Sequence, residues 1–197
     1  MGSETSVKNY KNNSDGDSSD SNDFNNSDPA TYFKNMDLRY FVAEPFEMLT
    51  KHARLKEKCL ENGNPEAHYI EGVLRYFVHK DKHKGLRHLR ESSMVNNTNG
   101  TYLYGLLMLA LGHYHKGKKY LDKLEWKESL STSDACLERV KNSLSTIPEI
   151  MNRRYYINKV NFKPRTSCNL DNMAKMCKHC YYFKRLDQFV QFSMSKE

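Results

Sequence analysis

The sequence predicts an all-α fold, a short array of stacked helical hairpins that follows a disordered N-terminal arm. Three observations predict it. One pattern of apolar residues, glycines and basic residues occurs twice between Asn64 and Leu121. A helix stop and a helix start lie side by side at Gly63 and Asn64, which precedes a proline. Residues 1–30 are rich in Ser, Asn and Asp, whereas the remainder carries most of the apolar residues.

The two copies of the pattern differ in position by about one repeat length. Gly72 aligns with Gly105 at an offset of 33 residues, and Leu89 aligns with Leu121 at an offset of 32. A repeat of this length that forms helix, turn, helix is typical of a tetratricopeptide-like array, in which each unit buries its apolar face against a neighbour. We assign the repeats to about 64–96 and 97–122. Arrays of this kind bind other proteins.

The N-terminal residues do not belong to the array. Their polar composition cannot bury enough apolar area to offset an ordering cost of about 1 to 2 kcal/mol per residue. We therefore predict a disordered arm over 1–30 and one α-helical repeat domain over 31–197.

The segments between the arm and the first repeat are expected to be mainly helical. Residues 32–44 fit a short helix and a loop, and Pro45 fits the first turn of a helix that stops near Gly63. Asn64 is then expected as the N-cap of the next helix, with Pro65 at its first position. A stop and a start so close together predict a tight antiparallel helical pair.

Gly72 and Gly105 occupy equivalent places in the middle of their helices. Glycine costs about 1 kcal/mol relative to alanine there. Its recurrence therefore predicts a close approach of two helices, which a side chain would block. Trp126 is the only tryptophan of the chain and is expected to anchor the turn after the second repeat.

Closing helices are expected over about 131–193. Ser131 to Asp134 resembles a capping box at the start of a helix, and a short helix is expected from Pro148. A loop is expected over 158–169. Apolar residues three and four apart over 170–193 then predict the terminal helix.

Charge is distributed unevenly along the chain. The formal net charge is +7, residues 1–29 carry −4, and the remainder therefore carries +11. Basic residues recur in the loop and the start of the second helix of each repeat, so stacking would bring them onto one basic edge. The basic edge consists of His79, Lys80, Lys82, His83, Lys84, His113, His115, Lys116, Lys118 and Lys119. It could bind an acidic or phosphorylated ligand. The alternative is a solvated surface without a ligand.

The chain holds five cysteines and has no apolar leader or membrane-spanning run. This favours a reduced protein of the nucleus or cytoplasm, without membrane contact. Cys168, Cys177 and Cys180 are the one metal-like group. A structural zinc site needs four ligands, and His179 is expected to point away from the cysteines. We therefore expect the cysteines to be core residues and no cofactor, with zinc binding by these three cysteines as the alternative.

The sequence lacks the motifs that mark common catalytic sites. It contains no phosphate-binding P-loop, no GxSxG, no HExxH and no glycine-rich dinucleotide fingerprint. We therefore expect the chain not to be an enzyme.

Two stretches carry a resemblance to a known family. They are the run from Cys59 to Tyr69, which reads CLENGNPEAHY, and the run from Met176 to Cys180, which reads MCKHC. Together with Gly72 and Gly105 they resemble the C-terminal tetratricopeptide-like region of plant F-box proteins, over roughly residues 32–192. The resemblance implies a helical region that holds the substrate of a cullin-RING ubiquitin ligase, to which the F-box docks through the Skp adaptor.

The chain departs from that family ahead of the repeats. An F-box needs a helical segment rich in Leu and Pro, and the polar arm takes that place here. We therefore expect a protein-protein interaction module that holds a partner protein without docking on Skp by itself. The alternative function is a basic-surface binder of nucleic acid or phosphorylated partners.

This expectation can be tested directly. The 197-residue chain, immobilised and incubated with purified Skp adaptor, should retain no more Skp than the empty resin. An F-box protein with an intact F-box serves as the positive control. Robust retention of Skp by the chain alone would overturn the expectation.

Overall fold

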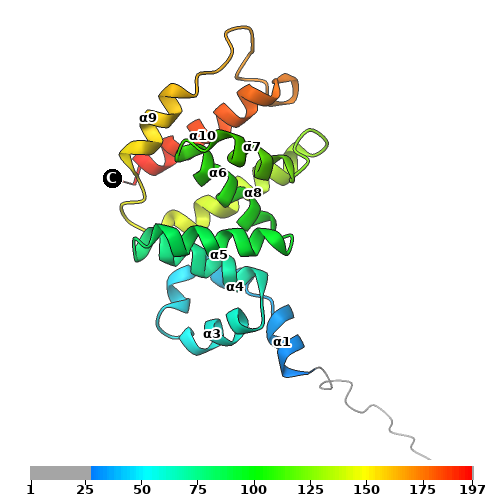
Figure 1. Ribbon diagram of the computed structural model, residues 1–197, viewed down its shortest axis with the longest axis vertical. Coiled ribbons are helices and arrows are strands. Elements are labelled where there is room, and N and C mark those ends of the chain that lie inside the picture. The colour runs from blue at the N-terminus through cyan, green and yellow to red at the C-terminus, as the bar shows by residue number, and fades with distance from the viewer. Residues whose placement is uncertain (1–27, 197) are drawn as a thin grey trace, which may run out of the picture.

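The computed structural model describes residues 28–196, and every regular element among them is helical, which confirms the all-α prediction (Figure 1). Residues 28–196 form ten α-helices and three short 3-10 or π segments. The α-helices are α1 (Pro29–Asn35), α2 (Arg39–Ala43), α3 (Ala53–Glu61), α4 (Pro65–Val73), α5 (Lys82–Met94), α6 (Thr98–Ala110), α7 (Tyr114–Asp122), α8 (Leu130–Ser145), α9 (Arg153–Asn161) and α10 (Lys178–Met194). The shorter segments are η1 (Pro45–Met48), the π-helical η2 (Leu74–Val78) and η3 (Met173–Lys175).

Each of the two repeats is a helical hairpin whose helices approach closely at a glycine. A Cβ atom at Gly72 in α4 would lie 2.7 Å from Leu89 Cγ in α5. A Cβ atom at Gly105 in α6 would lie 2.9 Å from Leu121 Cγ in α7. Both leucines are fully buried. The two glycines therefore have equivalent surroundings, with partners that the repeat alignment also pairs.

A second pair of glycines makes equivalent close contacts from the second helix of each hairpin. A Cβ atom at Gly85 in α5 would lie 2.5 Å from Tyr76 Cβ and 2.7 Å from the backbone nitrogen of the same residue. A Cβ atom at Gly117 in α7 would lie 2.6 Å from Leu109 Cδ2. Each hairpin is thus fixed by two close contacts, one from each of its helices.

The first helix of each repeat begins at an asparagine. The Asn64 side chain accepts hydrogen bonds from the backbone N–H groups of Glu66 and Ala67, and Pro65 is the first residue of α4. Asn97 lies 33 positions later and accepts from the N–H of Gly100 at the start of α6. These bonds satisfy donors that a helix start leaves without partners.

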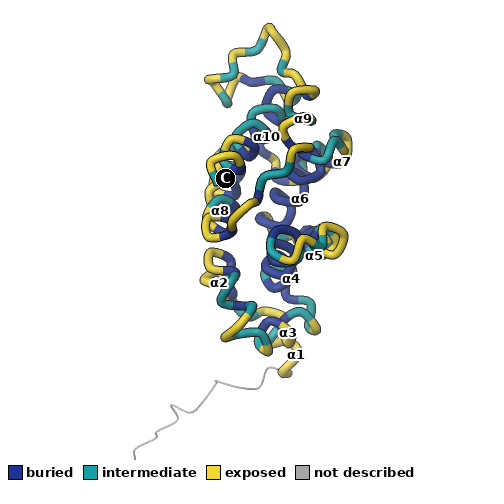
Figure 2. Tube along the Cα trace, turned by 90° about the vertical axis from the view of Figure 1, so that its left-hand side faces the viewer, coloured by how far each residue is buried: buried dark blue, intermediate teal, exposed yellow. Residues whose placement is uncertain are grey.

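Helix α6 lies at the centre of the molecule, and every residue from Asn99 to Ala110 is buried (Figure 2). It packs against α5 and α7 of the repeats and also against α8, α9 and α10. A helix that is buried on all sides must be apolar around its whole circumference, as the segment from Tyr102 to Ala110 is. The C-terminal helices therefore complete the core that the two hairpins begin.

Trp126 connects the turn after the second repeat to the last helix. Its ring stacks on Tyr181 of α10 with a centroid distance of 3.8 Å and an interplanar angle of 4°. The Tyr181 hydroxyl is hydrogen bonded to Ser133 of α8. Trp126 is 4% exposed, so this stack is part of the core.

Some helix boundaries differ from those that the sequence predicts. The single helix expected from Pro45 is interrupted, because Leu49 to Lys51 turn between η1 and α3, and His52 donates its backbone N–H to Glu47. Helix α8 begins at Leu130 with Ser129 as its N-cap, one residue before the expected capping box. The capping box is wrong, because Ser131 is the second residue of α8 and not its N-cap. The Ser129 hydroxyl bonds the hydroxyls of Ser131 and Thr132 instead of a backbone donor.

The last third of the chain shows the larger differences. Helix α9 begins at Arg153 rather than at Pro148, because Glu149 has a φ of +50°, which no α-helix contains. It then continues to Asn161, into the expected loop. The terminal helix begins at Lys178 rather than at residue 170, and η3 is the helical turn that precedes it.

Two further expectations concern the N-terminal arm and contact with a membrane. The arm predicted for 1–30 lies outside the described residues except for its last three, and α1 begins at Pro29. Across residues 28–196, each helix falls short of the length and apolar character that a bilayer crossing requires.

The close contacts of the hairpins can be tested at Gly85. Alanine there should gain about 1 kcal/mol of helix propensity. Its methyl group would meet backbone atoms of Tyr76, which cannot rotate away, and overpacking of this kind costs about 1 to 3 kcal/mol or more. Because the nearest backbone atoms lie at 2.7 and 2.8 Å, we expect a cost at the upper end of this range, about 2 to 3 kcal/mol. After the gain in helix propensity, Gly85→Ala should lower the free energy of unfolding by about 1 to 2 kcal/mol in urea denaturation.

Lys82→Ala is the matched control, because Lys82 is exposed on the same helix. It should change the free energy of unfolding by no more than about 0.5 kcal/mol. A Gly85→Ala protein as stable as the natural one would contradict the close approach of the two helices.

Candidate functional site

One hollow of the surface lies where the two repeats meet. It has a volume of about 440 Å³ and is lined by α5, α6 and the start of α7. We call it the first hollow. Its lining residues are His83, Leu86, Arg87, Arg90, Tyr104, Met108, His113 and Lys116. Leu86, Tyr104 and Met108 are apolar or aromatic, the other five are basic, and none is acidic.

A second hollow lies on the other side of α7. It has a volume of about 540 Å³ and lies between α7, the segment after α9 and the start of α10. Its lining residues are His115, Lys118, Lys119, Asp122, Arg165, Lys178, His179 and Tyr182. Asp122 is hydrogen bonded by the Tyr182 hydroxyl and lies 3.8 Å from the Lys178 amine. The one acidic side chain of the second hollow is therefore already engaged within the protein.

The structure divides the basic edge that the sequence predicts. His83, His113 and Lys116 line the first hollow, so residues from both repeats do meet there. His115, Lys118 and Lys119 line the second hollow. The amine of Lys116 lies 5.4 Å from the ring centre of Tyr104, and the amine of Lys118 lies 5.0 Å from that of Phe162. Aromatic rings thus help to hold two of the cations in place.

The other four residues of the basic edge line neither hollow. Lys80 donates a hydrogen bond to the Glu149 carbonyl at 3.0 Å, and Lys84 pairs with Asp81 at 3.3 Å. His79 and Lys82 are exposed. These residues lie around the start of α5, before the part of the helix that faces the second repeat.

Several basic residues of the hollows are absent from the predicted edge. Arg87 and Arg90 follow His83 on one face of α5, at helical spacings that would have revealed them. Arg165, Lys178 and His179 come from the irregular segment before α10 and from its first turn. No local pattern in the sequence indicates that these three residues lie beside α7.

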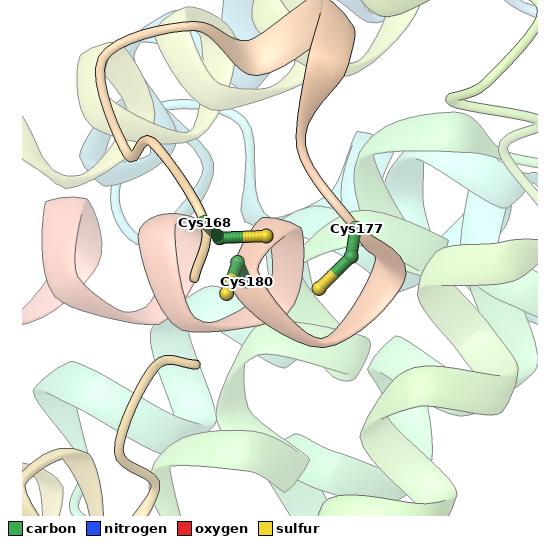
Figure 3. A group of neighbouring side chains, drawn as sticks. All are labelled: Cys168, Cys177 and Cys180. Atoms are coloured by element: carbon green, nitrogen blue, oxygen red, sulfur yellow. The ribbon is translucent and has the colours of Figure 1, made fainter. Parts of the chain in front are cut away.

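The three cysteines of the C-terminal region lie together at the start of α10 (Figure 3). We call Cys168, Cys177 and Cys180 the cysteine trio. Their sulfur atoms lie within 4.8 Å of one another. A backbone hydrogen bond from Cys180 lowers the pKa of the Cys177 thiol to about 7, and burial raises the pKa of the Cys180 thiol to about 11. The His179 ring contacts the Lys163 carbonyl at 2.6 Å and is not part of the trio.

A second group of ligand-type atoms lies between α4 and α5. The Nδ1 atoms of His68 and His88 are 3.0 Å apart, and they lie 3.2 and 3.4 Å from one Glu91 oxygen. Each histidine side chain is 16% exposed. The sequence alone does not indicate this group, because His68 and His88 are 20 positions apart, although His88 and Glu91 have a helical spacing.

Burial lowers the pKa of both histidines. Desolvation is the main cause for each, and it outweighs the opposing effect of the Glu91 carboxylate. The positive charge of Arg87 also lowers both values, whereas Glu71 raises them. Mutual repulsion contributes at His88, where the charge of His68 is the second cause. The pair therefore resists protonation in the folded chain.

The fold and the surface define a helical repeat domain of the protein-interaction class. Residues 38–148, more than half of the chain, match the family of plant tetratrico peptide repeats. The chain belongs to this family.

Two relatives from Arabidopsis thaliana match the chain. F-box protein At2g35280 is 33% identical over 96 residues, which are 49% of this chain and 58% of the relative. Putative F-box protein At1g67623 is 31% identical over 111 residues, which are 56% of this chain and 33% of the relative. The chain thus spans less than two thirds of the length of either relative. No solved structure matches it.

The histidine pair predicts a pH dependence of stability. Histidine titrates near 6.5 in an unfolded chain. Because the folded pKa values of His68 and His88 are lower, the unfolded chain binds protons first as the pH falls. Their contribution therefore lowers the free energy of unfolding below about pH 6.5, with a slope of at most about 1.4 kcal/mol per pH unit for each histidine.

Urea denaturation at pH 7.5 and pH 5.5 measures this effect. The double variant His68→Asn, His88→Asn should lose less stability between the two pH values than the natural protein. The variant Lys82→Asn, Arg90→Asn, with two exposed changes in α5, is the control and should keep the natural difference. If the double histidine variant loses as much stability between the two pH values as the natural protein, His68 and His88 are not the cause of the pH dependence.

Proposed function

We propose that the chain is the target-binding module of an F-box-type ubiquitin-ligase adaptor, and that its first hollow binds an acidic segment of the target protein. The family of repeats and the two relatives named as F-box proteins support the adaptor class. The observation that carries the choice of ligand is the lining of the first hollow, which combines five basic side chains with no acidic one.

The first hollow suits a peptide that alternates carboxylates with apolar side chains. Leu86 is half-buried and offers apolar surface to a ligand, whereas Tyr104 and Met108 line the hollow with 2% and 3% exposure. Arg87 and Arg90 can each bind a carboxylate through two parallel hydrogen bonds. Because these cations are exposed, each ion pair contributes at most about 1 kcal/mol and weakens with salt. Apolar contact therefore has to supply part of the affinity.

The same features favour a protein segment over a nucleic acid. Binding of single-stranded nucleic acid uses aromatic faces on which bases stack, together with a long basic groove. The ring of Tyr104 is 2% exposed and packs edge-on against Tyr120, so its face is not free for stacking. A hollow of about 440 Å³ accommodates a few side chains. It is too short for an extended track of phosphates.

Affinity purification from plant tissue, followed by mass spectrometry, tests the proposal. The natural chain is compared with the triple variant Arg87→Gln, Arg90→Gln, Lys116→Gln. We expect proteins with acidic segments to be retained by the natural chain. The triple variant should retain about tenfold less of them. Three exposed ion pairs of about 0.5 kcal/mol each contribute about 1.4 kcal/mol together, which corresponds to a tenfold change in affinity.

A matched control separates the first hollow from net charge. Lys51→Gln, Arg54→Gln, Lys127→Gln removes the same charge from exposed positions that line neither hollow and should retain the same proteins as the natural chain. Equal loss in both variants would contradict a specific site. Loss of the captured proteins after nuclease treatment would favour the nucleic-acid alternative.

A further inference from the structure

The cysteine trio brings the irregular segment after α9 next to the start of α10. Cys168 lies in the irregular segment between α9 and α10, Cys177 is the N-cap residue of α10, and Cys180 lies in its first turn. We propose that Cys168, Cys177 and Cys180 bind one Zn²⁺ ion as thiolates, and that the ion ties this segment to α10. The proposal is independent of the target that the first hollow binds.

The positions of the sulfur atoms suit a zinc ion. Zinc binds thiolates at about 2.3 Å in a tetrahedral arrangement, which places two ligand sulfurs about 3.8 Å apart. The three sulfur atoms of the trio already lie within 4.8 Å of one another, and Figure 3 shows their side chains gathered beside the first turn of α10. The sulfur atoms therefore have to move by about 1 Å at most to reach this separation.

Backbone N–H groups around the sulfurs support negative charge on them. The N–H of Arg165 donates to the Cys180 sulfur at 3.2 Å, across 15 residues of sequence. The Cys177 sulfur lies at the start of the 17-residue helix α10, where the helix dipole favours an anion. N–H donors of this kind orient metal ligands and stabilise them in the charged form.

The surrounding charges balance those of the complex. Three thiolates and one Zn²⁺ ion carry a net charge of −1. The segment from residue 162 to residue 180 carries Lys163, Arg165, Lys175 and Lys178 against the single acid Asp171. A basic segment of this composition compensates the complex without a buried counter-ion.

The segment between α9 and α10 would be stabilised by a cross-link. Residues 162–177 contain no regular structure except the three residues of η3. Irregular connections of this length are uncommon in a packed domain and are usually either functional or linker segments. A metal ion that joins Cys168 to Cys177 and Cys180 closes the second half of the segment and reduces the conformational entropy of its unfolded state.

Structural zinc sites usually have four protein ligands, and the described residues supply three here. The fourth coordination position is assigned to water, as in zinc sites with three protein ligands. The His179 ring is engaged with the Lys163 carbonyl and does not approach the trio. A disulfide within the trio is the competing arrangement, and it would leave the third cysteine without a role.

The experiment measures zinc in the full 197-residue chain, purified with a phosphine reductant and without chelator. We expect about one zinc per chain by elemental mass spectrometry. After zinc removal, addition of Co²⁺ should produce the thiolate-to-cobalt charge-transfer band and the intense visible bands of a tetrahedral site. Cys168→Ser should reduce bound zinc at least tenfold in the presence of a competing chelator.

Controls keep the result interpretable. Cys136→Ala removes a buried cysteine outside the trio and should keep the zinc and the cobalt spectrum. Cys168 is only partly buried, so its serine variant should keep the helical circular dichroism of the natural chain. The proposal is overturned if the reduced chain binds neither zinc nor cobalt, or if Cys168→Ser keeps the metal with undiminished affinity.

Discussion

The structure depends on one steric constraint, the close approach of the two helices within each hairpin. At Gly72 and Gly105 the partner leucine occupies the place where a side chain would begin. Such contact holds the helices in one relative position, because backbone and buried leucine leave no room for sliding. The position of α7 against α6, and of α5 against α4, follows from it. The first hollow is lined by three of these helices, α5, α6 and α7, and the second hollow is lined on one side by α7.

Much of the fold could be predicted because the repeat encodes it locally. The asparagine N-caps, the glycines and their leucine partners recur at intervals of 32 or 33 residues, and the structure places the members of each kind in equivalent surroundings. Helix boundaries after α8 could not be predicted, because distant contacts determine them. The Asn158 side chain, for example, donates to the Ala110 carbonyl in α6, and Lys80 donates to the Glu149 carbonyl. Neither contact leaves a periodic signal in the sequence.

The candidate sites, like the fold, could be predicted from the sequence only in part. The basic loops were visible in the sequence, and His83, His113 and Lys116 do line one hollow. Their separation from His115 and Lys118 follows from the faces of α7, on which residues three or four apart share a side. Which neighbouring segment meets each face depends on distant contacts. The histidine pair was missed because its members lie on different helices and become neighbours only through the close packing of α4 and α5.

The segment before α10 links the second hollow to the cysteine trio through Arg165. The backbone N–H of Arg165 donates to the Cys180 sulfur, while its side chain lines the second hollow. Cys180 is fully buried at the start of α10, so it provides a fixed point for an otherwise irregular segment. An ion held by the trio would reinforce this fixed point. It would thereby set the position of one cation of the second hollow, although the ion itself contacts no ligand there.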